Sequence, residues 1–380
     1  MKESRASCPK YSVLQEIEYN KLNPLRVILL SKQKFEENVN LKFLILPTSM
    51  TRVEEDGVHG NDGVIGDIIH PIERGIIKDW DAMEDLWRYT FYTGLGWEPG
   101  NEGQLLVAEP LLTPKVSRER MVQTMFETFN VGGLYAVEQA VLSLYAVGRI
   151  TGVVIDAGHG KIDIAPVWEG AIQHNAVKRF EISGQDLTDF LAKELARSQP
   201  DVKLDLATVE MLKEKYAAVA EDSSAYVATA EACPKIQHTL PDGQVISVGR
   251  ERYDVGEALL RPSIFGIEED GLAEQLLRSV STCSPSENQR QLIENIVLCG
   301  GTSMIRGLDS RFQKEAVLVA NPSVRPSLIK PPEYMPDNTL INSAWMGGAI
   351  LAKVVFPQNQ HITKAEYDEA GPPIVHRKCF

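Results

Sequence analysis

The sequence has 380 residues, of which 39 are Lys or Arg and 52 are Asp or Glu, and its formal net charge at pH 7 is −13. An acidic surface repels phosphate backbones, which argues against direct binding of nucleic acid and would attract a basic partner helix; the alternative is that the charge only keeps the protein soluble. The hydrophobic fraction of 43% and charged fraction of 24% are those of a soluble globular protein, and the length predicts two to three domains.

The cysteines and the first residues indicate the cell compartment. The five cysteines lie far apart, without CxxC or metal-site spacing, which predicts free thiols in a reducing compartment. Met1 to Lys10 is polar and lacks a signal-peptide pattern, and the longest early apolar runs, Val27–Leu30 and Phe43–Leu46, are too short to span a bilayer. We therefore expect a cytosolic or nuclear protein with no membrane partner, although no basic import motif is visible.

The first half of the chain predicts three helices after an irregular start. Residues 1–42 show no clear period, a strand is expected at 43–46, and an acidic, Gly-rich loop at 51–67 should be exposed and mobile. Asp81 and Glu84 have the spacing of an N-cap and N3 pair, opening a helix that Gly94 ends. Ser117 is expected to cap a second helix, and residues 137–147 predict a third.

The second half mixes strands with helices. Strands are expected at 152–155, 162–167 and 296–298, and helices at 186–196, 208–218 and 287–295. Pro241-Asp-Gly243 predicts a hairpin between its apolar flanks, and a further helix should follow Gly300-Gly-Thr-Ser303. The chain is therefore predicted to be an α/β protein.

Two of these strands end in small-residue turns that suit an anion. Asp156-Ala-Gly-His-Gly160 begins a hairpin whose glycines let backbone N–H groups approach a phosphate, and Asp156 would hold Mg²⁺ through water. Gly300-Gly-Thr-Ser303 places glycines at a helix start, where a ribose or phosphate fits. Each segment taken alone is more often an ordinary turn.

The order of these segments, with several others, resembles the actin family over residues 44–380. The matching segments are Glu138-Gln-Ala-Val-Leu-Ser-Leu-Tyr-Ala146, Asp156-x-Gly-x-Gly160, Leu240-Pro-Asp-Gly-Gln-Val-Ile246, Gly300-Gly-Thr302, Trp345-x-Gly-Gly348, Tyr367-Asp-Glu and Val375-His-Arg-Lys-Cys-Phe380. Within the family the chain is similar to a nuclear actin-related protein of plants, through segments such as Pro71-Ile-Glu-Arg-Gly and Lys330-Pro-Pro-Glu-Tyr-Met-Pro336.

The resemblance implies an actin-like α/β fold, of the duplicated ribonuclease H-like type, with two lobes around a nucleotide cleft. Residues 44–150 and 345–380 would form the first lobe and residues 151–344 the second, after a divergent segment at 1–43. Each lobe would be built on a related five-stranded core.

The resemblance also implies a site for ATP with Mg²⁺. Its nucleotide-binding residues would be Asp156, Gly158, Gly160, Lys213, Glu214, Gly300, Gly301, Thr302 and Met304. Asp156 would lie near the metal, and Gln139 would orient the attacking water unless it is only a polar residue on a packed helix. Without the resemblance, Lys213 and Glu214 read better as an exposed helix face.

Two departures from the family bear on nucleotide chemistry. Residues 1–42 contain no glycine and so lack the opening phosphate loop, which suggests an alternative first exon or a truncated isoform with an incomplete first lobe. His159 stands where the family has an acid, and Asp163 where it has a histidine that helps activate water. With Gln139 they would be vestigial catalytic residues, so we expect little or no ATPase activity.

Two further features concern partners. The short acidic loop between Pro47 and Pro71, and the three acids that end the segment 262–270, disfavour filaments. Positions where the family binds amphipathic helices match Tyr145, Gly148, Ile150, Gly170, Leu351 and Val354, although Tyr145 and Leu351 could equally be core residues. In nuclear relatives the corresponding face docks a long basic helix of a chromatin-remodelling motor.

We therefore expect a non-catalytic subunit of a SWI/SNF-type chromatin-remodelling complex that regulates gene expression and development, in the nucleus and also the cytoplasm. Its partners would be a helical segment of the remodelling ATPase and another actin-related protein. Two alternatives stay open: an ATP-binding cytoskeletal protein that forms filaments, and a poorly functional isoform without the first phosphate loop.

Overall fold

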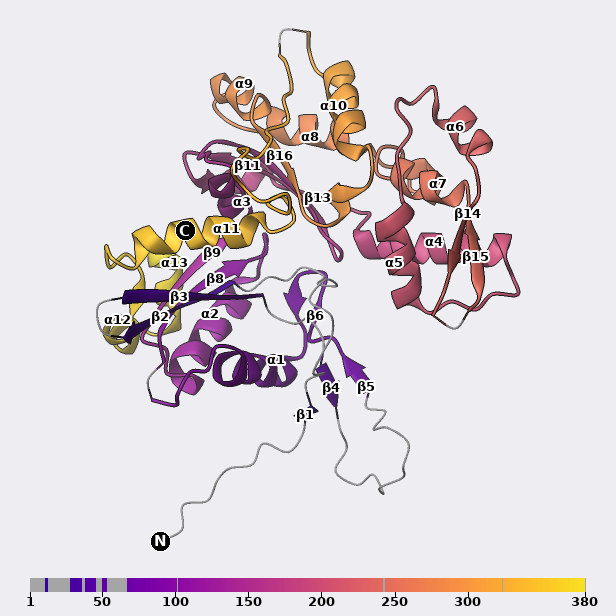
Figure 1. Cartoon of the computed structure of the whole chain (residues 1–380). Coiled ribbons are helices and arrows are strands. Elements are labelled where there is room, and N and C mark those ends of the chain that lie inside the picture. Colours follow the sequence, from indigo (N-terminus) through magenta and orange to yellow (C-terminus); the bar gives the residue numbers. More distant parts are fainter. Residues whose placement is uncertain are drawn as a thin grey trace, which may run out of the picture. The chain divides into compact units, whose positions relative to one another are not determined.

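The computed structural model describes residues 11–12, 28–35, 38–45, 50–52, 67–100, 102–241, 243–322 and 324–379 (Figure 1). The chain forms two compact units: Met1–Gln139 with Gly348–Phe380, and Ala140–Gly347. The lobe boundaries expected at residues 150 and 344 stay predictions. They were taken from the resemblance to a family, whereas the two units are defined only by which residues of this chain contact each other.

The N-terminal part of unit 1 contains strands that the sequence pattern did not predict. β2 (Ile28–Phe35) and β3 (Asn38–Ile45) form an antiparallel hairpin, so the prediction of no regular element before residue 43 was wrong. Both strands are rich in Ile, Leu, Val and Phe, residues that favour strands, but the lysines and asparagines between them hide a period of two. β1 (Tyr11–Ser12), β4 (Met50–Arg52) and β5 (Asp67–Ile69) form a separate three-stranded sheet. The acidic loop lies mainly outside the described residues.

The central sheet of unit 1 was also missed by sequence reasoning. β8 (Gln104–Glu109) and β9 (Gly133–Glu138) are parallel, and β17 (Ile362–Thr363) pairs with the start of β9. β6 (Ile72–Glu73) and β7 (Ile76–Ile77) form a short hairpin. Strands buried on both faces appear as continuous apolar runs, which do not show the alternation that identifies a strand.

Two long helical segments pack on this sheet. α1 (Trp80–Arg88) continues as the π-helix η1 (Tyr89–Gly94), and α2 (Lys115–Gln123) continues as the π-helix η2 (Thr124–Thr128). Gly94 ends the first helix as predicted. The predicted N-cap was wrong, because Asp79, not Asp81, accepts the Ala82 N–H at 3.0 Å. Ser117 is likewise not a cap, since Pro114 already stands at the N-cap and Lys115 begins the helix.

The C-terminal residues complete the core of unit 1. α12 (Lys364–Ala370), the 3₁₀ turn η6 (Pro372–Ile374) and α13 (Val375–Lys378) follow β17. The capping box between Thr363 and Glu366 begins α12, and the ring of Tyr367 stacks on Phe126 with centroids 4.5 Å apart. The end of the chain therefore packs directly against the helix that follows β8.

Glu109, the last residue of β8, is a buried carboxyl. It lies beside Arg118 of α2, with Nε 2.7 Å from Oε2. Burial raises the pKa of Glu109 from 4.5 to about 7, and Arg118 offsets only part of that rise. Because the folded protein binds this proton more tightly than the unfolded chain does, the free energy of unfolding should fall as pH rises from about 4.5 to about 7.

Glu109→Gln tests this contribution. The decrease in unfolding free energy between pH 5 and pH 8 should be about 2–3 kcal/mol smaller in the variant than in the parent protein, measured by urea unfolding at each pH. Glu98→Gln removes an exposed carboxyl of the same unit and should leave the pH dependence unchanged. Parallel pH profiles for Glu109→Gln and the parent would contradict the assignment.

Unit 2 is built on a mixed five-stranded sheet. β10 (Gly152–Ala157) lies between β11 (Ile162–Trp168), which is antiparallel to it, and β16 (Ile296–Cys299), which is parallel. β12 (Ala171–Ile172) and β13 (Lys178–Phe180) both pair with β11. The three strands predicted from the sequence are confirmed, each one or two residues longer than expected.

The helices of unit 2 form two groups, one on this sheet and one that packs mainly on itself (Figure 1). The first group is α8 (Leu272–Ser281), α9 (Glu287–Ile293) and α10 (Leu308–Val319), of which α8 and α9 contact the sheet. The second is α4 (Gly184–Ser198), α5 (Leu206–Tyr216), α6 (Tyr226–Ala232) and α7 (Glu251–Glu257), with the hairpin β14 (Ile236–Thr239) and β15 (Val245–Val248). The predicted helices and the Pro241 hairpin are confirmed, with shifted ends.

Two helices contain the boundaries between the units. α3 (Gln139–Ala146) and α11 (Ser343–Val355) contact each other within unit 2, where a Cβ on Gly347 would lie 1.7 Å from the carbonyl oxygen of Leu142. The predicted start of α3 at residue 137 was wrong because β9 extends to Glu138. Within the described part of the chain, no helix is both long and apolar enough to cross a bilayer.

Candidate functional site

The turn between β10 and β11 has the form of an anion-binding loop. The Gly158 N–H donates to the Lys161 carbonyl at 2.9 Å and closes the hairpin around His159 and Gly160. Within the described residues, the N–H groups of His159 and Gly160 donate to no protein acceptor. Two successive free N–H groups in a glycine turn are what a phosphate oxygen requires.

The start of α4 holds this turn in place, and sequence reasoning did not find it. The Gly184 N–H donates to the Gly158 carbonyl at 3.0 Å, and the Gln185 N–H donates to the His159 carbonyl at 2.7 Å. A Cβ on Gly184 would lie 2.5 Å from Thr302 Oγ1 and 2.9 Å from the Gly158 carbonyl. The available signal was Ser183 followed three residues later by Asp186, which form a capping box.

The segment after β16 meets the same turn. Gly300 has a φ of +90°, and Thr302 Oγ1 donates to the Gly158 carbonyl at 3.0 Å. The helix expected directly after these glycines is only the 3₁₀ turn η5 (Thr302–Met304), and α10 begins at Leu308. The two segments singled out from the sequence, about 140 residues apart, are therefore joined by a direct hydrogen bond.

Asp156 and Asp163 lie opposite each other on adjacent strands. Asp156 of β10 pairs with Asp163 of β11, which in turn pairs with Arg179 of β13. Directly opposed residues in a ladder point to the same face of the sheet, so these three side chains form one cross-strand row. Asp156, the residue predicted to hold Mg²⁺, is half-buried near the end of β10.

Both oxygens of the Asp163 carboxylate are occupied. The side chain is fully buried; Oδ2 accepts from Lys161 Nζ at 2.5 Å, and Oδ1 accepts from Arg179 Nε at 2.7 Å. Arg179 Nη2 adds a contact of 3.1 Å to Oδ2. A carboxylate whose two oxygens both accept hydrogen bonds from cationic side chains leaves neither oxygen free for a water, and is therefore a poor general base.

The side chain of His159 lies beside Glu210 of α5. Its Nδ1 lies 3.0 Å from Oε1 of Glu210, an ion-pair distance at which the angle is not that of a hydrogen bond. No group of three or more His, Cys, Asp or Glu within the described ranges has the arrangement of a metal cluster. The assignment of Mg²⁺ to Asp156 stays a prediction.

Comparison with known proteins identifies the family. A family model described as Actin matches residues 49–207 and 203–380. The chain belongs to the actin family. It is 63% identical to Actin-related protein 7 of Arabidopsis thaliana over 341 residues, which is 89% of this chain and 93% of that protein. It is 58% identical over 337 residues to the Actin-related protein 7 of Oryza sativa subsp. indica and of subsp. japonica, with the same coverage.

Family membership confirms the resemblance and the actin-like α/β fold class predicted from the sequence. Residues 1–48 lie outside the match to the actin model. The turn from Gly158 to Gly160 is the segment that the resemblance assigns to the second phosphate loop, and within the described residues the N–H groups of His159 and Gly160 have no protein acceptor. Nucleotide binding at this turn stays a prediction. The opening loop of the family would fall within residues 1–42, most of which lie outside the described residues.

Of the residues assigned to the purine side, Lys213 has a different setting from that expected of an exposed helix face. It is buried, and its Nζ donates to the Gly184 carbonyl at 2.6 Å and to Thr188 Oγ1 at 2.7 Å, so it fastens α5 to the start of α4. Burial lowers the pKa of Lys213, while nearby acids oppose that shift. Glu214, Gly301 and Met304 are exposed, and Gln139 is buried at the start of α3.

The residues predicted to bind a partner helix divide between the two units. In unit 2, Ile150 is 59% exposed next to Gly148, whose φ is +72° and which has open space around it. Gly170 has a φ of +82°, and a Cβ there would lie 2.8 Å from the hydroxyl of the half-buried Tyr145. In unit 1, Leu351 is half-buried and Val354 exposed on α11. The groove as a whole stays a prediction.

Proposed function

We propose that the protein is a non-catalytic structural subunit of a SWI/SNF-type chromatin-remodelling complex in the nucleus. It would bind a long basic helix of the remodelling ATPase, beside another actin-related protein, and so regulate gene expression and development. The proposal that the protein is non-catalytic is supported by the Asp163 carboxylate, which stands at the position where the family activates water. Both of its oxygens accept hydrogen bonds from Lys161 and Arg179. The assignment to a remodelling complex is what the resemblance to nuclear relatives implies.

The surface chemistry supports a partner that is basic and amphipathic. The chain has a net charge of −13, and Ile150 exposes an apolar side chain two residues after Gly148, which has open space around it. A helix that presents an apolar stripe to a groove and lysines to its rim would satisfy both features. Weak binding of ATP with Mg²⁺ at Gly158 and Gly160 is compatible with this role, because a bound nucleotide can stabilise a fold without being hydrolysed.

The proposal predicts a binding defect from one substitution in the groove. Ile150→Asp should weaken binding of a labelled long basic helix from a plant remodelling ATPase at least about tenfold, because a buried charge would replace an apolar anchor. Fluorescence anisotropy with the purified full chain measures the dissociation constant. Leu206→Asp is the matched control, since Leu206 is 58% exposed in the same unit but outside the groove.

Three outcomes would count against the proposal. Equal binding by Ile150→Asp and the parent would show that the groove does not bind the helix. Concentration-dependent pelleting with Mg-ATP would favour the cytoskeletal alternative. A broad melting transition with strong dye binding to exposed apolar surface, in the parent protein, would favour a poorly folding isoform.

A further inference from the structure

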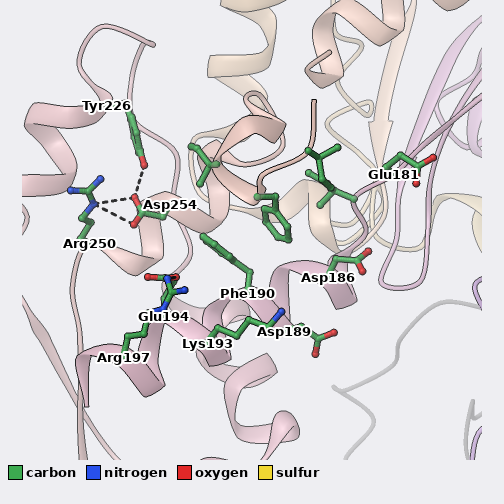
Figure 2. A pocket seen from close by; sticks show the side chains of 14 residues that line it. Glu181, Asp186, Asp189, Phe190, Lys193, Glu194, Arg197, Tyr226, Arg250 and Asp254 are labelled. Atoms are coloured by element: carbon green, nitrogen blue, oxygen red, sulfur yellow. Dashed lines mark hydrogen bonds and ion pairs between the residues drawn. The ribbon is translucent and has the colours of Figure 1, made fainter. Parts of the chain in front are cut away.

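A second concave site lies in unit 2, away from the residues assigned to nucleotide or partner helix. A pocket of about 730 Å³ is lined by residues from α4, α6, α7, η4 (Pro262–Phe265) and their flanking segments (Figure 2). This volume is within the range of ligand-binding pockets. None of its lining residues belongs to the sites predicted from the sequence.

The floor of this α4–α7 pocket is apolar. The ring of Phe190 on α4 stacks on Phe265, with centroids 4.5 Å apart and planes at 27°. Ile264 and Ile267 also line the pocket, and all four side chains are half-buried rather than covered by the rest of the chain. An apolar side chain placed here would therefore remove further hydrophobic surface from water.

One end of the pocket is electrically balanced. Asp254 accepts from the Tyr226 hydroxyl at 2.5 Å, and Arg250 Nε lies 3.3 Å from its other oxygen, as the dashed lines in Figure 2 show. Arg197 pairs with Glu194 at 2.5 Å. Each cation at this end therefore already has a carboxylate of the same chain beside it.

The opposite end carries excess negative charge. Glu181, Asp186 and Asp189 gather there in Figure 2, and Asp186 is engaged in the capping box of α4. Glu181 and Asp189 have no ion-pair partner among the described residues. The fourteen lining residues include five acids and three bases, a net charge of −2.

A neighbouring carboxyl, Glu269, adds to the negative charge at this end, although Arg278 pairs with the adjacent Asp270. Glu269 lies just after Ile267, and its Oε2 is buried without a hydrogen-bond partner in the described structure. Burial first, and then the negative charges of Glu181 and Asp270, raise the pKa of Glu269, while the Glu181 backbone and the charge of Arg278 oppose that rise. A positive charge placed beside Glu181 would relieve this repulsion.

We propose that the α4–α7 pocket binds a basic segment of a partner protein. An aliphatic or aromatic side chain of that segment would pack on Phe190 and Phe265, and an adjacent Lys or Arg would lie beside Glu181 and Asp189. Charge complementarity favours a basic segment over an anionic ligand, because the lining carries a net charge of −2 and two of its three bases, Arg197 and Arg250, are already paired, which leaves only Lys193. This surface goes beyond the proposed groove, and it can be correct whether or not that groove binds a remodelling ATPase.

Methyl NMR of the full chain with labelled isoleucines tests this assignment. The probe is the peptide acetyl-Lys-Phe-Lys-amide, and acetyl-Glu-Phe-Glu-amide is its charge-reversed counterpart. The resonances of Ile264 and Ile267 should shift with the basic peptide and saturate at about millimolar concentration, as expected for so small a ligand. Ile72 and Ile76 of unit 1 should not move, and the acidic peptide should give no shift.

Two double variants of equal charge change locate the effect. Glu181→Gln with Asp189→Asn should weaken binding of the basic peptide at least about fivefold. Glu287→Gln with Asp309→Asn removes two exposed carboxylates that do not line the pocket, and should leave affinity within about twofold of the parent. The proposal is overturned if the acidic peptide binds as well as the basic one, if the two double variants behave alike, or if Ile264 and Ile267 do not respond.

Discussion

Asp163→Asn should lower the free energy of unfolding by about 3–5 kcal/mol, the usual cost of removing one member of a buried ion pair. The neutral amide would leave Lys161, which is 7% exposed, without a counter-charge inside the sheet of unit 2. Arg179 would lose the same partner but can turn toward water, since its side chain is 32% exposed. Urea unfolding at pH 7 measures the effect.

Lys161 supplies the internal control for this experiment. If the loss comes from an unpaired ammonium, Lys161→Met combined with Asp163→Asn should recover at least about 1 kcal/mol relative to Asp163→Asn alone. Asp309→Asn, at an exposed position of α10, should change stability by less than about 0.5 kcal/mol. A loss of less than about 1 kcal/mol of unfolding free energy in Asp163→Asn would mean that the carboxylate does not pair with these two cations. It would then be available to act as a base.

Gly300→Ala should be nearly as damaging, with an expected loss of about 3 kcal/mol. Gly300 has a φ of +90°, and a Cβ there would lie 2.4 Å from the carbonyl oxygen of Ala157 in β10. Backbone strain and this collision cannot both be relieved without separating β16 from β10. Thermal unfolding of the variant measures the loss.

The neighbouring glycine is the control. Gly301 has a helical backbone, with φ −64° and ψ −38°, and a Cβ there would meet no atom within 4 Å. Gly301→Ala should therefore keep parental stability within about 0.5 kcal/mol. Equal effects of the two substitutions would show that the segment after β16 is not held in the described conformation.

The sequence predicted the second unit better than the first, for a physical reason. β10, β11 and β16 are bounded by glycine turns that end each apolar run, and a turn residue can be recognised without knowing its neighbours in space. β8 and β9 are not followed by a glycine turn, and their burial on both faces removes the alternation. Asp79 was missed as a cap because Asp81 and Glu84 have the same spacing as a capping pair, and only backbone geometry distinguishes them.

The candidate site shows a similar limit. The two glycine segments were found because their residue types carry the chemistry themselves, and the structure joins them through Thr302 and Gly158. The tie from Lys213 to Gly184 depends on residues 29 positions apart that no local pattern connects. The hydrogen bond from Arg179 to Asp163 likewise depends on pairing between β11 and β13. The sequence therefore identified Asp163 as unusual but did not predict its partner Arg179.

The central claim is best tested by purifying the tagged protein from nuclear extract and identifying its companions by mass spectrometry. The proposed function predicts that a remodelling ATPase, another actin-related protein and further subunits of that complex are recovered with the parent protein. These companions should be lost from Ile150→Asp and retained by Leu206→Asp. Recovery of only chaperones or conventional actin with the parent protein would contradict the proposed function.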